Sequence, residues 1–268
     1  MAMANKVVSI LGCGWYGMAL AKHLIKQGYK VRGSTTSSHK LQLLNDASIL
    51  PYQVSFEPGY EEFDPDFFVC DVLIISIPPK RRAGEAGLYP EKLKAVIHAI
   101  RENAVKKVVF ISSTSVYADG NFEVDETSIP TPDSESGKAL LEAENLLKAQ
   151  SIFKISVLRF GGLFGPGRHP GRFFAGKKNI ANGKAPVNLI HLNDCIGITE
   201  AIIAKDAFGH TFNACSSQHP EKMQFYIDAA QKSGFEVPEF IPELVSWKIV
   251  DSILLEPVLN YKVGPLNQ

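Results

Sequence analysis

Three glycines near the start of the chain have the spacing of a phosphate-binding turn. The sequence Gly12-Cys13-Gly14-Trp15-Tyr16-Gly17 follows a short apolar run and precedes a helical pattern. Glycine is needed there because the backbone takes unusual angles and a diphosphate must approach bare main chain at the positive end of the helix. The context predicts a dinucleotide site, with a purely structural turn as the alternative. The residues expected to bind the dinucleotide are Gly12, Gly14, Trp15, Tyr16 and Gly17.

The end of the second predicted strand bears on which dinucleotide binds. An acidic side chain about 20 residues beyond the glycines normally receives the ribose 2′-hydroxyl of NAD. Residues 31–38 contain no acid but include Ser34, Thr35 and Thr36. These hydroxyls and nearby backbone amides could hold a 2′-phosphate, with Arg32 or Lys40 to balance its charge, or they could be ordinary turn and capping residues. We therefore predict NADP as the cofactor, with NAD possible.

Short apolar runs alternate with helical patterns over the first 160 residues. Strands are expected at 6–11, 30–34, 49–54, 72–77, 108–111 and 155–158. Helices are expected at 18–28, 41–44, 90–100 and 134–149. This order predicts an α/β fold, a Rossmann-type doubly wound parallel sheet that binds ligands at the carboxyl ends of its strands.

The composition changes after about residue 160. Residues 161–183 are rich in glycine and basic side chains, and the patterns beyond predict further elements. Strands are expected at 189–191 and 211–213, and helices at 194–205, 223–231 and 245–255. We divide the chain into a Rossmann domain over residues 1–160 and a small substrate-side lobe over residues 161–268, interleaved with the first and not independent.

Charge and composition exclude several classes of protein. The net charge of zero argues against a general nucleic-acid or membrane-surface binder. No apolar run approaches the roughly 20 residues that span a bilayer, and no signal peptide is recognisable. The four cysteines are scattered, without metal-ligand spacing. We expect a reduced cytoplasmic protein without a metal site. Residues 145–193 contain no acidic side chain, and we expect their basic side chains to make the entrance of one pocket positively charged.

Five segments carry a resemblance to a known family. They are GCGWYG at 12–17, ISSTSVY at 111–117, VLRFGGLFGPG at 157–167, HLND at 191–194 and GHTFNA at 209–214. In this order they resemble the extended short-chain dehydrogenases/reductases, in particular the NAD-dependent epimerase/dehydratase group. The resemblance implies NAD(P)-dependent redox or epimerase chemistry on a small molecule, for example one like a nucleotide sugar. A homodimer through the helices that flank the sheet is also plausible.

The resemblance further implies a Ser that binds the reacting oxygen, a Tyr that transfers a proton, and a Lys four residues after the Tyr. Ser113 falls on the serine position. Alignment of residues 135–144 puts Ser136 at the tyrosine position and Leu140 at the lysine position, so that pair is missing. Tyr117 is the nearest candidate for the acid, although a structural or substrate-lining role is the alternative.

Other residues are candidates for ligand contacts. Ile77 and Pro78 follow the fourth strand, where the family's backbone passes the cofactor. Arg168 and Arg172 lie in a loop that overhangs the family's substrate cleft, and guanidinium groups bind carboxylates or phosphates with paired hydrogen bonds. The basic residues at 80–82 could also meet an anion, and a solvated loop is the alternative in each case. An anionic small molecule is therefore the expected partner.

The remaining predictions are structural roles for two residues and two candidate functions for the whole chain. Arg159 could pair with an acid beneath the site rather than touch a ligand, and Asp194 is expected to cap a helix. The first function is an oxidoreductase or epimerase that uses Ser113 and a relocated acid. The second is a non-catalytic NADP-binding protein with a redox-sensing or regulatory role.

Overall fold

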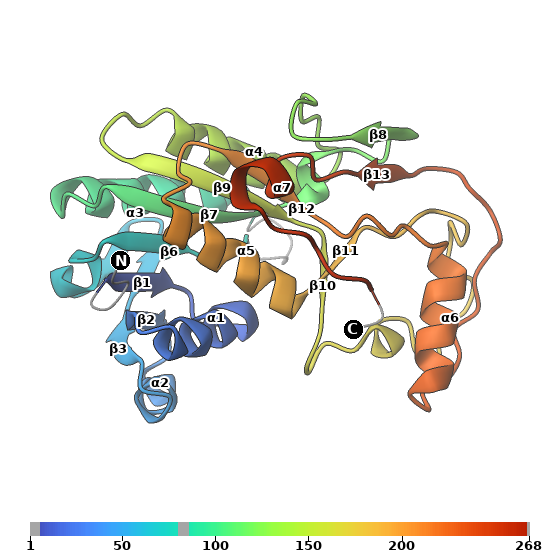
Figure 1. The fold of residues 1–268 in the computed structure, drawn as a ribbon, viewed down its shortest axis with the longest axis horizontal. Coiled ribbons are helices and arrows are strands. Elements are labelled where there is room, and N and C mark those ends of the chain that lie inside the picture. The colour runs from blue at the N-terminus through green and yellow to red at the C-terminus, as the bar shows by residue number, and fades with distance from the viewer. Residues whose placement is uncertain (1–5, 80–85, 267–268) are drawn as a thin grey trace.

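A seven-stranded parallel sheet forms the centre of the molecule, in the order β12-β9-β7-β6-β1-β2-β3 (Figure 1). The computed structural model describes residues 6–79 and 86–266. The strands are β1 (Val7–Leu11), β2 (Lys30–Thr35), β3 (Leu50–Gln53), β6 (Val72–Ile75), β7 (Lys107–Ser113), β9 (Lys154–Phe160) and β12 (Thr211–Ala214). All four residues of β6 are buried, as expected for a strand covered on both faces. The predicted Rossmann-type fold is confirmed.

Helices cover both faces of this sheet. On one face lie α1 (Trp15–Lys26), α5 (Leu192–Lys205) and the short α7 (Leu255–Leu259), and on the other α3 (Tyr89–Glu102) and α4 (Glu135–Lys148) (Figure 1). The short α2 (Leu41–Asp46) leads into β3. Ser134 begins α4 by accepting a hydrogen bond from the Gly137 N–H at 3.1 Å. No helix of the described residues is long and apolar enough to cross a bilayer.

Residues after 160 leave the sheet and return to it. The chain forms β10 (Gly162–Phe164), pairs it with β11 (Leu189–His191), and then contributes α5 and β12 to the main layers. The helix α6 (Lys222–Lys232) lies apart from the sheet, at the right of Figure 1. A hairpin joins β4 (Ser55–Glu57) to β5 (Tyr60–Glu62). Short 3₁₀ helices span Ser38–Lys40, Pro65–Phe68, Ala86–Leu88, Thr114–Val116 and Pro170–Arg172.

Two sequence predictions in the second half are wrong. Residues 245–255 do not form a helix, because β13 (Lys248–Val250) pairs in parallel with β8 (Phe122–Val124). Asp194 does not cap α5, which begins two residues earlier. The His191 Nδ1 atom instead accepts from the Asn193 N–H at 3.2 Å. The first difference comes from pairing with a distant strand, and the second from a local cap by a side chain three residues before Asp194.

Neither edge of the sheet presents a continuous open strand. At the β12 edge, the Glu126 carboxylate accepts from the N–H groups of Asn213 and Ile253, both at 2.9 Å. At the β3 edge, the Val54 N–H points inward to the Thr35 carbonyl at 3.0 Å. The alternation of a strand therefore directs position 51 outward, where Pro51 has no N–H to offer.

Candidate functional site

Two of the three glycines in the turn are required by close backbone approaches. Gly12 has a φ of +101°, and a Cβ there would lie 2.9 Å from Ile77 Cγ2 and 3.0 Å from the Ser76 carbonyl oxygen. A Cβ on Gly17 would lie only 2.4 Å from the Gly12 carbonyl oxygen. The turn thus fits tightly between the end of β6 and the start of α1, which fixes the direction of the helix.

Gly14 differs because its surroundings are open. It is exposed, and no heavy atom lies within 4 Å of the position of a Cβ. It precedes α1, whose N-terminus has no side-chain cap and no acidic residue in its first turn. The helix therefore offers N–H groups and its positive end without a bulky or negative neighbour. This open helix end has room for the diphosphate that the sequence predicts there, and the residues that would bind it stay a prediction.

The hydroxyl residues at the end of β2 have different surroundings. Ser34 is buried and holds the turn, because its Oγ accepts from the Gly12 N–H and its carbonyl oxygen from the Cys13 N–H, both at 2.9 Å. Thr35 is half-buried and Thr36 exposed. Ser34 therefore supports the turn from below, while Thr35 and Thr36 stay candidates for contact with the ribose.

Arg32 points away from these hydroxyls. Its guanidinium donates to the Val69 carbonyl oxygen at 2.6 Å and to that of Asp66. This engagement holds the segment before β6 and leaves Arg32 poorly placed to balance a 2′-phosphate. The choice of NADP over NAD stays a prediction.

Ile77 and Pro78 lie just beyond β6, beside the turn. The Tyr89 hydroxyl donates to the Ile77 carbonyl oxygen at 2.7 Å, which fixes this segment, and Ile77 Cγ2 faces Gly12. Pro78 is exposed. Ile77 thus packs against the glycine turn, and its contact with a cofactor stays a prediction. The basic residues at 80–82 lie outside the described residues.

Ser113 and the start of α4 come together. Ser113 ends β7, is half-buried, and accepts a hydrogen bond at its Oγ from the Ser115 N–H at 3.2 Å. The first turn of α4 packs on the same loop, because a Cβ on Gly137 would lie 2.2 Å from the Ser115 carbonyl oxygen. Ser136 is half-buried beside Gly137, whereas Leu140 is buried in the apolar core. Leu140 therefore offers no polar group here, and the loss of the Tyr and Lys pair stays a prediction.

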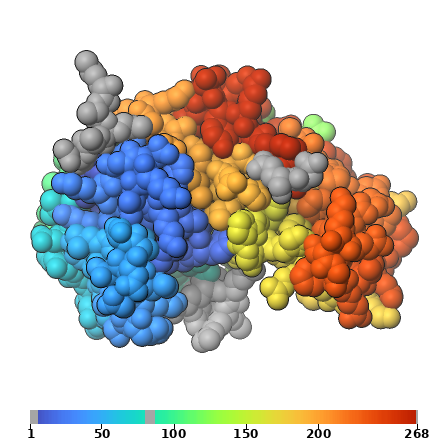
Figure 2. Space-filling model, turned by 60° about the horizontal axis from the view of Figure 1, so that its bottom comes forward, coloured from blue at the N-terminus to red at the C-terminus, as the bar shows by residue number. Residues whose placement is uncertain are grey.

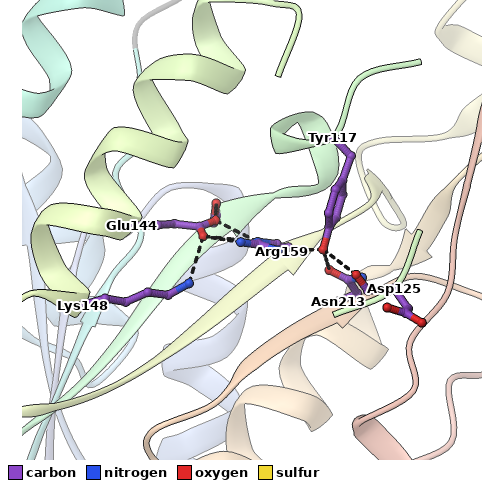
Figure 3. A network of polar contacts seen from close by, with 7 residues as sticks. Tyr117, Asp125, Glu144, Lys148, Arg159 and Asn213 are labelled. Atoms are coloured by element: carbon purple, nitrogen blue, oxygen red, sulfur yellow. Dashed lines mark hydrogen bonds and ion pairs between the residues drawn. The ribbon is translucent and has the colours of Figure 1, made fainter. Parts of the chain in front are cut away.

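The hydroxyl of Tyr117 lies in the interior, in a polar network (Figure 3). Tyr117 is 1% exposed. Its oxygen accepts from Arg159 Nη1 at 2.6 Å, and the hydroxyl is within donating distance of Asn213 Oδ1 at 3.1 Å and the Asp125 carbonyl oxygen at 3.0 Å. Burial raises the pKa of the Tyr117 hydroxyl, and the Arg159 charge opposes that rise. These contacts favour the structural role for Tyr117, and its role as an acid stays a prediction.

Arg159 pairs with an acid beneath the site, as predicted, and that acid is Glu144 on α4 (Figure 3). The distances are 2.6 Å from Arg159 Nη2 to Glu144 Oε2 and 3.0 Å from Nε to Oε1. Ser112 Oγ donates to Glu144 Oε1 at 2.6 Å, and Lys148 Nζ lies 3.3 Å from Oε2. Burial pushes the pKa of Glu144 upward, but the Arg159 hydrogen bonds and charge outweigh it and leave that pKa below its ordinary value.

The predicted anion-binding arginines lie against different aromatic rings. The Arg168 guanidinium lies 4.8 Å from the Trp15 ring centroid, and Trp15 Nε1 donates to the Pro166 carbonyl oxygen at 2.7 Å. Arg172 lies 5.6 Å from the Phe235 ring centroid in the lobe. Arg168 therefore stands beside the glycine turn, whereas Arg172 is anchored away from it.

A cleft of about 1040 Å³ separates the 165–170 loop from α6. His169, His191 and His219 are among its lining residues, and Phe164 and Phe225 are among its apolar ones. His219 Nδ1 donates to the Val187 carbonyl oxygen at 3.0 Å. Its buried Nε2, a bare acceptor, has no hydrogen-bond partner among the described residues. Sequence reasoning missed His219, because nothing in its local pattern distinguishes it.

Comparisons with known proteins agree with this geometry. The model of the NAD dependent epimerase/dehydratase family matches residues 92–213. Protein YeeZ of Escherichia coli strain K12 is 36% identical over 246 residues, which cover 91% of this chain and 89% of YeeZ.

Solved structures share the fold at lower identity. A functionally unknown conserved protein from Silicibacter pomeroyi superposes with a TM-score of 0.78 at 23% identity. UDP-glucuronic acid 4-epimerase from Bacillus cereus, in complex with NAD, superposes with a TM-score of 0.79 at 18% identity. Each alignment covers 97% of this chain and 94% of the other.

Proposed function

Because the chain belongs to the NAD-dependent epimerase/dehydratase family, we propose that it is an NAD(P)-dependent epimerase or oxidoreductase that acts on an anionic small molecule. The observation that carries this proposal is the open N-terminus of α1 at Gly14. It lies at the carboxyl ends of the parallel strands, as Ser113 does at the end of β7. The fold shared with a UDP-glucuronic acid epimerase supports a substrate like a nucleotide sugar.

The cofactor-binding part follows from the turn. The backbone of Gly12, Gly14 and Trp15 would hold the diphosphate, and Ile77 would wall this site on the β6 side. When bound, the nicotinamide ring supplies a reversible hydride acceptor. Thr35 and Thr36 are the residues proposed to meet the adenosine ribose or its 2′-phosphate.

The substrate-side chemistry is proposed for Ser113. Its Oγ accepts from a backbone N–H, which orients the hydroxyl so that its proton is available to a substrate oxygen. The half-buried Ser136 could extend that set of hydroxyls. Tyr117 would hold Arg159 in place rather than donate a proton, since its hydroxyl is enclosed.

The cleft beside the 165–170 loop is the proposed entry for the substrate. It borders Pro166, which also contacts Trp15 of the turn. The bare Nε2 of His219 would accept a hydrogen bond from a substrate hydroxyl or amide. The charged residues that line the cleft are Asp228 and Lys232, one of each sign. Arg168 belongs to this loop, and Arg172 follows it at the end of the short helix Pro170–Arg172.

Substitution of Gly14 tests the proposal directly. Gly14→Ala adds a methyl group where no protein atom lies within 4 Å, so thermal unfolding should match that of the wild-type chain. The methyl group would occupy the approach of the diphosphate, and we expect the affinity for NADPH and NADH to fall at least about tenfold, equivalent to about 1.4 kcal/mol. Gly17→Ala should instead disturb folding as well as binding. A wild-type chain that binds neither nucleotide, or a Gly14→Ala variant that binds both normally, would refute the proposal.

The second candidate is a non-catalytic NADP-binding protein with a redox-sensing or regulatory role. The buried Leu140 and the enclosed Tyr117 hydroxyl favour it, because neither can replace the missing pair. Oxidation of bound NADPH by carbonyl compounds and sugar nucleotides separates the candidates. Tight NADPH binding without turnover over a broad range of substrates would favour this second function.

A further inference from the structure

One loop of the second half of the chain is seated directly on the glycine turn. Trp15 Nε1 donates to the Pro166 carbonyl oxygen at 2.7 Å, and Arg168 lies 4.8 Å from the Trp15 ring centroid. These contacts join residues about 150 positions apart in the sequence. In Figure 2 the yellow surface of this part of the chain borders the blue N-terminal surface, which carries the turn.

The loop is shaped for this contact. Arg168 N donates to the Gly165 carbonyl oxygen at 2.8 Å, and Gly165 N donates to that of Arg168 at 3.2 Å, which closes a tight turn. Gly165 and Gly167 have φ values of +143° and +78°, which favour glycine. A Cβ on Gly165 would lie 3.0 Å from Leu192 Cβ, so the loop rests on the start of α5 as well as on Trp15. It is supported on both sides.

Its position relative to a ligand follows from chain order. Trp15 is the first residue of α1 and comes directly after the open Gly14. A diphosphate bound at this helix end would lie beside the indole. Arg168 is held next to that point by the indole face, and no carboxylate of the described residues forms an ion pair with it. Its charge is therefore available to a phosphate.

We propose that Trp15, Pro166 and Arg168 form a clasp over the diphosphate end of the dinucleotide site and set the rate at which the dinucleotide leaves. This inference rests on the proposed function. In this proposal Arg168 binds the cofactor and not the substrate. Its planar guanidinium supplies two parallel hydrogen-bond donors for a phosphate of the dinucleotide. Release requires the loop to separate from the indole, and this breaks the Trp15 hydrogen bond and the cation–π contact together.

Stopped-flow displacement of bound NADPH, and separately of NADH, tests the clasp. Trp15→Phe and Arg168→Gln should each raise the release rate about tenfold, since each removes one contact worth roughly a factor of ten. Because release breaks both contacts together, the double variant should release the nucleotide faster than either single one, by up to about a hundredfold. Trp247→Phe, which replaces the other tryptophan, is the matched control and should leave the rate unchanged.

The possible results distinguish failure of the clasp from failure of the proposed dinucleotide-dependent function. A wild-type chain that binds neither nucleotide would overturn the proposed function and the clasp together. Normal binding with unchanged release rates in both single variants would overturn the clasp alone. An Arg168→Gln variant that raised the KM of an anionic substrate, but left nucleotide release unchanged, would return Arg168 to the substrate and also overturn it.

Discussion

Arg159→Met tests the buried ion pair beneath the site. The change removes the guanidinium and keeps a long unbranched side chain, so that Glu144, which is 0% exposed, retains only Ser112 and Lys148 as polar partners. Removal of one partner from a buried pair costs about 3–5 kcal/mol of unfolding free energy. For a chain of this size we expect the midpoint of thermal unfolding to fall by roughly 10 °C.

Urea unfolding at pH 7, followed by circular dichroism, measures this loss. In the double variant Glu144→Leu/Arg159→Met no uncompensated charge is buried, and most of the stability should return. Glu135→Gln is the matched control, since the Lys138–Glu135 pair at 2.8 Å has side chains 57% and 80% exposed and its loss should cost less than about 0.5 kcal/mol. A loss below about 1 kcal/mol for Arg159→Met, or a double variant less stable than either single one, would refute the reasoning.

Four further predictions concern pH, Tyr117, Ser34 and the choice between NADP and NAD. Because the pKa of Glu144 is lower in the folded chain than its ordinary value of 4.5, its stabilisation is present above that value and is lost as the pH falls through the folded pKa. Urea titrations below pH 4.5 should therefore show a steeper loss for the wild-type chain than for the double variant. Tyr117→Phe should cost about 1–3 kcal/mol by leaving Arg159 Nη1 without its acceptor. The same variant abolishes NADPH oxidation if Tyr117 is the acid, and full activity would remove it from that role. Ser34→Ala should weaken dinucleotide binding severalfold in a fluorescence titration, because the Gly12 N–H loses its acceptor. In the wild-type titration, equal or tighter binding of NAD than of NADP would contradict the predicted preference.

Local patterns were enough to predict most of the sheet. Some features are determined by a few neighbouring residues and can be read from the local sequence. They include the buried strand Val72–Ile75, the helix start at Ser134 and the glycine turn before α1. The pairing of Arg159 with an acid was also foreseeable, because an arginine on a buried strand requires a partner.

Contacts between distant segments could not be predicted in this way. Lys248–Val250 has a helix-compatible pattern, but it becomes a strand only because Phe122–Val124 lies alongside it. The bare nitrogen of His219 depends on a carbonyl group 32 residues away. The seat of the Pro166 loop on Trp15 likewise exists only once both halves of the chain have folded.

The covered sheet edges limit how two copies of this chain could associate. Continuous sheets across a dimer require each copy to present a free row of N–H and carbonyl groups. At one edge Glu126 already ties Asn213 to Ile253, and at the other Pro51 interrupts the row of donors. A homodimer of this protein would therefore not join the two sheets into one continuous sheet, and its assembly would respond to sequence changes on other surfaces rather than to changes in the edge strands.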